Sequence, residues 1–378
     1  MILNRYFNYI DHDRIVEHES TAYYLLRDFD KEPGAYWYLE FKLSLAKLHE
    51  AIPPDVLRAI INGNIGLMLC NSHEAFHEVI SEIYEHAINR LGIHEQKIVL
   101  LTESADIFDE VEIVAARLNK LQITVKWARM FERSVAIDKE FLERCGNKIQ
   151  TLVDKPYTKK FINFNRRWRF HRPTLVALLH ARNLLEKGYV SLAPCDDNMT
   201  WERVWGHIMH LHQYNGSILQ SLVTNKDRIM SLPPLYLDSS ELMTNLPNLT
   251  DTTDSMYENT YFSVVAETNY YDHQPGRFLS EKTFKPIGQR HPFIIVSVPN
   301  MLPLLRGIGY KTFSPFINET YDTETDSSTR MLLLIEEIER LSNLTPDELT
   351  EFLDGVRPIC EHNYQVLKSK TSWITDLN

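Results

Sequence analysis

The chain has 378 residues, which is long for a single hydrophobic core and favours two domains. Its hydrophobic fraction of 44% and its charged fraction of 24% are typical of a globular protein and argue against a disordered chain. The formal net charge of −11 argues against a general polyanion-binding surface, because phosphate contacts need clustered Lys and Arg.

The sequence contains no apolar run long enough to span a bilayer, and its start lacks the pattern of a secretory signal. We therefore expect a cytoplasmic protein without a membrane-spanning segment. The four cysteines lie far apart and form no C-x-x-C pair, so neither a zinc clip nor a redox motif is expected.

In the first half of the chain, apolar runs alternate with amphipathic stretches. Residues 36–62 have helical spacing, interrupted by Pro53 and Pro54. Beyond them we expect strands at 65–72, 97–104 and 122–130, and helices at 77–92 and 106–120. Strands that alternate with helices indicate a parallel sheet covered on both faces.

The alternation restarts after a less regular stretch. We expect a strand at 160–165, a helix at 173–188, and further strands at 189–193, 261–267 and 292–298. The tail, from about residue 347, has helical spacing. Two such alternating units favour two α/β domains, which we place at residues 1–158 and 159–348, followed by a helical segment at 349–378.

Charge is concentrated between the last two expected strands. Ser280 is a good N-cap, so a helix should begin at Glu281 and end near Gly288. In a parallel sheet this turn lies at the carboxyl edge, where free backbone N–H groups favour anions. We expect Lys282 and Arg277 to reach a phosphate, and Glu281 to accept hydrogen bonds from ribose hydroxyls. The alternative is a solvated helix start, since Glu is ordinary in a first turn.

A second polar cluster follows the strand at 160–165. Pro173, which is favoured at the first helical position, opens the next helix, so this turn has the same anion-binding geometry. Arginine guanidinium groups match phosphate oxygens in pairs. The candidate donor-binding residues here are Asn165, Arg166, Arg167, Arg169 and Arg172. The alternative is a basic face paired with acids elsewhere in the chain.

Three motifs together resemble a known family. V-V-A-E-T at 264–268, F-L-S-E-K-T-F at 278–284 and H-P-F-I at 291–294 resemble the donor-binding signature of fucosyltransferase-like and exostosin-like glycosyltransferases. The chain is more similar still to glycosyltransferases of phage and marine viral genomes, which share S-E-K-T-F-K-P-I, a segment like residues 312–317, and E-x-Y-D like residues 319–322. The resemblance covers about residues 160–340.

The resemblance implies a GT-B fold, in which two Rossmann-like domains with parallel sheets face an interdomain cleft. The second domain would hold a nucleotide-diphosphate sugar and the first domain the acceptor, without an obligatory metal or cofactor, and the final helix would return to the first domain. By the same resemblance, Glu267 and Glu281 contact the sugar or ribose, Ser280 belongs to the donor motif, and Lys282 with an arginine neutralises the diphosphate. Arg277 and the long segment before Ser280 depart from the fucosyltransferase spacing.

The general base and the acceptor stay open. His73 or Glu74, after the first expected strand, and Glu103, after the second, would reach the carboxyl edge of the first sheet and could deprotonate an acceptor hydroxyl. Each could equally be a capped helix start. If the chain is viral, its acceptor is a surface glycan or a hydroxymethylated base of phage DNA, and its location is the host cytoplasm.

Two other readings compete with glycosyl transfer. His73-Glu74-Ala75-Phe76-His77 matches H-E-x-x-H, the motif of zinc peptidases, but it opens a helix and no third ligand is evident. A nucleotide-binding or glycan-binding module without catalysis is the other alternative. The D-x-D pairs at 11–13 and 28–30 precede every expected strand and are poorly placed for a metal-bound diphosphate.

Overall fold

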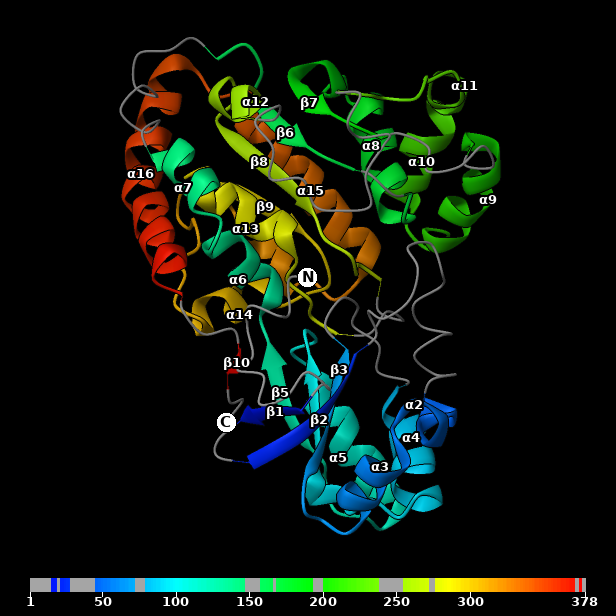
Figure 1. Ribbon diagram of the computed structural model, residues 1–378. Coiled ribbons are helices and arrows are strands. Elements are labelled where there is room, and N and C mark those ends of the chain that lie inside the picture. Colours follow the sequence, from blue (N-terminus) through cyan, green and yellow to red (C-terminus); the bar gives the residue numbers. More distant parts are fainter. Residues whose placement is uncertain are drawn as a thin grey trace. The chain divides into compact units, whose positions relative to one another are not determined.

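The computed structural model describes residues 15–18, 21–27, 45–71, 79–146, 157–165, 168–192, 200–237, 254–271, 276–370 and 374–375. Contacts divide the chain into two compact units (Figure 1). Unit 1 comprises Met1–Met130, Pro275–Phe278 and Ser372–Asn378. Unit 2 comprises Phe131–Gln274 and Leu279–Thr371.

Unit 1 is built on a sheet with the order β1-β2-β3-β4-β5-β10. The central strands β2 to β5 are parallel, and β1 and β10 add antiparallel edges. The strands are β1 (Ile15–His18), β2 (Thr21–Arg27), β3 (Gly66–Asn71), β4 (Ile98–Thr102), β5 (Thr124–Ala128) and β10 (Ile374–Thr375). Every residue of β4 is buried, as its continuous apolar sequence predicts for a central parallel strand.

Short helices cover the unit 1 sheet and supply most of its core. They are α2 (Leu48–Ala51), α3 (Pro54–Ile61), α4 (Val79–Ile83), the π-helical turn Tyr84–Arg90, the 3₁₀ turn Glu95–Lys97 and α5 (Ile107–Leu118). Pro54 occupies the first turn of α3, where its missing N–H costs nothing. Helix α5 is followed by the C-cap residue Asn119, whose backbone is left-handed with φ at 51°.

Unit 2 is built on a four-stranded parallel sheet with the order β7-β6-β8-β9. Its strands are β6 (Phe161–Asn163), β7 (Gly188–Val190), β8 (Phe262–Ala266) and β9 (Phe293–Val296). Its helices are α6 (Met130–Ala136), α7 (Lys139–Gly146), α8 (His171–Ala181), α9 (Trp201–Leu211), α10 (Gly216–Thr224), α11 (Lys226–Met230), α12 (Asp254–Glu258), α13 (Glu281–Gly288), α14 (Met301–Gly307), α15 (Ser327–Ser342) and α16 (Pro346–Ser369), with 3₁₀ turns at Leu185–Lys187 and Thr320–Thr323.

The strand order of unit 2 reverses at its centre. From β6 the chain passes through α8 to β7 on one side, and from β8 it passes through α13 to β9 on the other. Because such crossovers are right-handed, α8 and α13 lie on opposite faces of the sheet. The point between β6 and β8 is therefore the topological switch point, where open α/β sheets bind their ligands.

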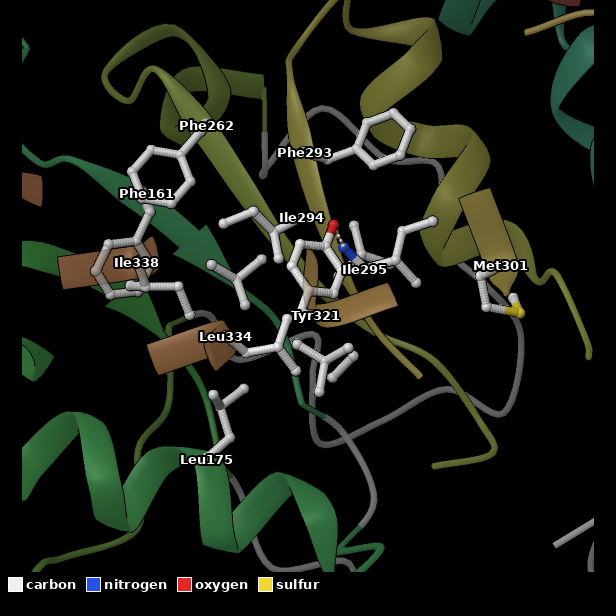
Figure 2. Packing of buried hydrophobic residues seen from close by; sticks show 14 of the residues in the cluster. Phe161, Leu175, Phe262, Phe293, Ile294, Ile295, Met301, Tyr321, Leu334 and Ile338 are labelled. Carbon is white, nitrogen blue, oxygen red and sulfur yellow. Dashed lines mark hydrogen bonds between the residues drawn. The ribbon is translucent and has the colours of Figure 1, made fainter. Parts of the chain in front are cut away.

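The core of unit 2 joins the sheet to the helices on one face. Figure 2 shows Leu175 of α8 and Leu334 and Ile338 of α15 packed near Phe161 and Ile294 of the strands. The dashed line in Figure 2 is the hydrogen bond from the Ile295 N–H to the Tyr321 hydroxyl, 3.4 Å long. On the opposite face, α13 contacts β8, α16 and α7. Helices thus pack on both faces of the sheet beside the switch point.

The predicted α/β fold class, with two units that are each built on parallel strands, is confirmed. The GT-B name for this fold rests on the family resemblance alone. That the sheets face a common cleft stays a prediction. One local expectation is wrong: β1 and β2 precede residue 65, and β2 ends at Arg27, so the Asp28-Asp30 pair follows a strand. Residues 28–44, including this pair, lie outside the described residues.

The compact units do not coincide with the predicted domains. Contacts divide the chain at Met130 and not near residue 158, because α6 and α7 supply Val135 and Phe141 to the core of unit 2. Helix α16 buries Phe352 in that same core, and the part of the chain end that belongs to unit 1 carries β10. The domain limits 1–158, 159–348 and 349–378 stay predictions, as does the return of the last helix to the first domain.

Within the described ranges, no helix combines the length and the apolar character that a bilayer crossing requires.

Candidate functional site

Polar side chains follow the strands of unit 2 at the switch point. Asn163 ends β6, Asn165 lies two residues beyond it, Ser191 follows β7 and Glu267 follows β8. All four are fully buried. Carboxyl ends of parallel strands meet at one edge of the sheet, so these four residues form a buried polar layer at that edge.

The two asparagines join the ends of neighbouring strands by hydrogen bonds. Asn163 donates from Nδ2 to the Val264 carbonyl over 2.8 Å, which ties β6 to β8. Asn165 donates from Nδ2 to the Ser191 carbonyl over 3.0 Å, and its backbone N–H donates to the Ser191 hydroxyl over 3.0 Å. Asn165 was predicted to bind a donor. The structure shows a buried residue that joins the ends of β6 and β7, and the donor contact stays a prediction.

The start of α8 lies over the same edge. His171 donates from Nε2 to the Glu267 carbonyl over 2.9 Å, and Arg172 donates from Nη2 to the carbonyls of Ala266 and Glu267 over 3.0 and 3.2 Å. Burial, reinforced by the charge of Arg172, holds the pKa of His171 well below its usual value, so this imidazole is neutral. Phe170 precedes the helix and provides no side-chain cap for its first N–H groups.

The predicted start of α13 is confirmed. The helix begins at Glu281, and Ser280 is its N-cap, accepting a hydrogen bond from the Lys282 N–H over 3.4 Å. Beneath this turn, the Glu267 carboxylate accepts hydrogen bonds from the Ser280 N–H over 3.0 Å, the Ser280 hydroxyl over 2.6 Å and the Thr283 hydroxyl over 2.6 Å. Glu267 has no exposed side-chain surface.

Glu281 and Lys282 are the charged side chains of this turn with some access to solvent, 17% and 28% exposed respectively. The Lys282 ammonium lies 2.7 Å from the Ser280 hydroxyl, 3.3 Å from the Glu281 carboxylate and 3.9 Å from that of Glu267. Burial acts to raise the pKa of Glu281, but the charges of Lys282 and Lys285 outweigh it and lower the pKa below its usual value. Glu281 is therefore ionised at neutral pH.

Arg277 has a different environment, within unit 1. It donates to the carboxylate of Asp106 from its backbone N–H over 2.6 Å and from Nε over 2.8 Å. Its carbonyl accepts from the Ala105 N–H over 3.0 Å, and the neighbouring Phe278 forms an antiparallel bridge with Ser104. The structure thus gives Arg277 a carboxylate partner at the start of α5, and its phosphate contact stays a prediction.

The remaining predicted residues are only partly described. Glu103 is buried directly after β4, and its carbonyl accepts a hydrogen bond from Trp127 Nε1 over 2.9 Å. Arg169, just before α8, is half-buried. His73, Glu74, His77, Arg166 and Arg167 lie outside the described residues. Among the residues that are described, no group of His, Cys, Asp and Glu is arranged to hold a metal ion.

Sequence reasoning missed three residues of the site, Asn163, His171 and Thr283. Thr283 lies within the segment 278–284 and His171 lies beside the candidate arginines, but a hydroxyl and a neutral imidazole carry no charge pattern that would single them out. His207, His210 and His212 also lie close together in the sequence. In the structure His212 is buried and shares a hydrogen bond of 2.8 Å with Ser328, which is a packing role.

A pocket opens at the other edge of the unit 2 sheet. Its lining includes Tyr157, Tyr261, Pro292, Val356 and Cys360 and is mostly apolar. Tyr157, Tyr261 and Pro292 precede β6, β8 and β9, so the pocket lies at the amino edge. Ligands of open α/β sheets bind at the carboxyl edge, so we place the candidate site at the switch point.

No protein-family model matches the sequence, and a search of curated proteins finds no match. Among solved structures, the chain is similar to a UDP-forming α,α-trehalose-phosphate synthase from Burkholderia xenovorans, at 10% identity and a TM-score of 0.42 over 89% of this chain and 78% of that one. It is also similar to a trehalose-6-phosphate synthase, at 8% identity and a TM-score of 0.40 over 88% of this chain and 75% of that one. A glycosyltransferase from Rickettsia africae matches at 10% identity and a TM-score of 0.36 over 90% of this chain and 81% of that one. Similarity at this level identifies neither an activity nor a substrate.

Proposed function

We propose that the protein is a glycosyltransferase that moves a sugar from a nucleotide-diphosphate donor to a hydroxyl acceptor. The observation that carries the proposal is the start of α13. There a partly exposed lysine and an ionised glutamate lie beside the switch point of a parallel sheet, within the S-E-K-T-F sequence that resembles the donor motif of such enzymes.

The chemistry of donor cleavage fits these groups. When the sugar leaves, negative charge builds on the departing nucleoside diphosphate, and fixed positive groups stabilise that charge. Lys282 supplies an ammonium that is partly exposed at the start of α13. The ionised Glu281 is suited to accept hydrogen bonds from ribose hydroxyls. We propose that this set needs no obligatory metal.

The general base belongs to unit 1 in this proposal. Glu103, His73 and Glu74 follow the ends of β4 and β3, where Rossmann-like sheets present their ligands. A base at this edge would take the proton from the acceptor hydroxyl as the sugar is transferred.

The net charge of the chain bears on which of the two candidate acceptors is favoured. The net charge of −11 favours a surface glycan over the phosphate backbone of DNA. Hydroxymethylated phage DNA is the other acceptor, and Arg166 and Arg167 would be its candidate contacts. Retention of the protein on immobilised duplex DNA that falls steeply with salt would indicate the DNA acceptor.

A thermal-shift screen against UDP, GDP, CMP and TDP sugars tests the proposed function. We expect a rise in melting temperature with one nucleotide class, and slow hydrolysis of that donor when no acceptor is present. Binding without any hydrolysis or transfer would indicate a non-catalytic nucleotide-binding module. Stoichiometric zinc by elemental analysis, with activity lost after chelation, would restore the peptidase interpretation of His73, Glu74 and His77.

A further inference from the structure

Glu267 is joined to the starts of both helices that open at the switch point. Its backbone carbonyl accepts hydrogen bonds from His171 and Arg172 in the first turn of α8. Its carboxylate accepts hydrogen bonds from Ser280, the N-cap of α13, and from Thr283 in the first turn. One residue thus fixes two helix starts that approach the same sheet edge.

The oxygens of this carboxylate are used inside the protein. Oε1 accepts from the Ser280 N–H and the Thr283 hydroxyl, and Oε2 accepts from the Ser280 hydroxyl. The side chain has no exposed surface that a ribose or a sugar could touch. A buried carboxylate is also costly unless hydrogen bonds satisfy it, which these three donors do.

The carboxylate also acts on Lys282 through Ser280. The Ser280 hydroxyl donates to Glu267 and accepts from the Lys282 ammonium over 2.7 Å, and the ammonium lies 3.9 Å from the carboxylate itself. A flexible lysine loses considerable rotamer entropy when it binds a ligand. Holding its ammonium in place before the ligand arrives reduces that loss.

We propose that Glu267 is a positioning residue of the donor site, which fixes the α13 start and the Lys282 ammonium for the diphosphate and makes no contact with the sugar or ribose. This inference rests on the proposed function. It replaces the direct sugar or ribose contact that the family resemblance implies for Glu267. A negative charge beneath a phosphate site would otherwise weaken binding, so its presence there favours a geometric role.

Inorganic pyrophosphate separates the two roles, because it has the phosphates of every nucleoside diphosphate but no ribose or sugar. Its affinity, and that of the nucleotide sugar found in the screen, would be measured by calorimetry for the wild type, Glu267→Gln and Glu267→Ala. We expect Glu267→Ala to weaken both ligands by the same factor, about 10-fold or more, and Glu267→Gln to weaken both less. Loss of nucleotide-sugar binding with unchanged pyrophosphate binding would overturn the inference in favour of a direct contact.

A double-mutant cycle tests whether Glu267 acts through Lys282. In a Lys282→Ala background, replacing Glu267 should change pyrophosphate affinity by less than about 3-fold, because the positioned group is gone. Equal effects in both backgrounds would contradict a role through Lys282. Ser280→Ala keeps the carboxylate but removes the link to the ammonium, so it should weaken pyrophosphate binding about as much as Glu267→Gln does. This variant replaces Glu267→Ala in the test if Glu267→Ala does not fold.

Arg290→Ala is the matched control for stability. Arg290 lies at the other end of α13, so its loss should lower the melting temperature without changing pyrophosphate affinity. If this control also weakens pyrophosphate, the effect of Glu267 is general destabilisation and the inference is wrong. A wild type that binds pyrophosphate but no nucleotide sugar would contradict the proposed function alone, whereas one that binds neither would contradict both.

Discussion

Lys282 is the residue whose replacement tests the donor site most directly. Its side chain is 28% exposed, so truncation should change the free energy of unfolding little. Removing a charged hydrogen bond to phosphate should weaken donor binding by about 10- to 100-fold. Calorimetry on Lys282→Ala would measure this, with Arg306→Ala, an exposed cation of α14, as a charge-matched control. Unchanged donor affinity in Lys282→Ala would contradict the site assignment.

His291 makes stability depend on pH. It is buried just before β9, donates from Nε2 to the Thr260 carbonyl over 3.0 Å and accepts from the Ser263 hydroxyl over 2.7 Å. Burial lowers its pKa to about 4. Between about pH 6.5 and 4, the unfolded chain therefore binds more protons here than the folded chain, and stability falls as the pH falls.

For this one histidine, the free energy of unfolding should fall by about 2 kcal/mol between pH 7 and pH 5. His212, whose pKa burial also lowers to about 4, should add to it. Urea unfolding at the two pH values would measure the loss for the wild type and for His291→Asn. The variant should be less stable at pH 7 but lose less on acidification. An equal loss in both proteins would show that His291 does not carry the effect.

At the scale of the element, the end of α13 contains an unusual residue. Arg290 adopts a left-handed backbone with φ at 52°, and its N–H and that of His291 bond the carbonyls of Ile287 and Pro286, as in a helix-ending turn. Glycine is the usual residue there, and arginine costs about 1 kcal/mol of backbone strain. Its guanidinium donates to the Glu361 carboxylate over 2.8 Å and to the Cys145 carbonyl over 2.9 Å, and so joins α13 to α16 and α7.

We expect Arg290→Ala and Arg290→Gly both to lower the free energy of unfolding, because both remove these side-chain contacts. The glycine variant should be the more stable of the two by about 1 kcal/mol, since it relieves the left-handed backbone. Denaturant unfolding of the pair would measure the difference. A glycine variant no more stable than the alanine variant would show that the turn is not strained.

At the scale of the whole molecule, the two units have separate hydrophobic cores. Leu100 of β4 belongs to the core of unit 1, and Ile338 of α15 belongs to that of unit 2. We expect two unfolding transitions in calorimetry, since each core can melt cooperatively by itself. Leu100→Ala should lower the temperature of one transition, and Ile338→Ala that of the other. Each variant should reduce the free energy of unfolding of its own unit by roughly 2–5 kcal/mol, the cost of a large-to-small core change. A single transition lowered equally by both variants would contradict independent units.

The sequence alone determined the features that depend on neighbouring residues. The start of α13 at Glu281 could be read from Ser280, because capping is a contact within one turn. The parallel sheets followed from apolar runs that alternate with amphipathic stretches. Strands β1 and β2 were missed because they precede that alternation, and β1 is a short edge strand that pairs antiparallel.

Only the tertiary structure decided which charges are used internally. From the sequence alone, a ligand could bind Arg172, Arg277 or Glu267. The sequence shows which residues are charged but does not show which residues they contact. In the structure Arg172 binds strand carbonyls, Arg277 binds Asp106, and Glu267 is enclosed by the start of α13. Asp106 is 171 residues away from Arg277 along the chain, and only the folded chain brings such distant groups within hydrogen-bonding distance.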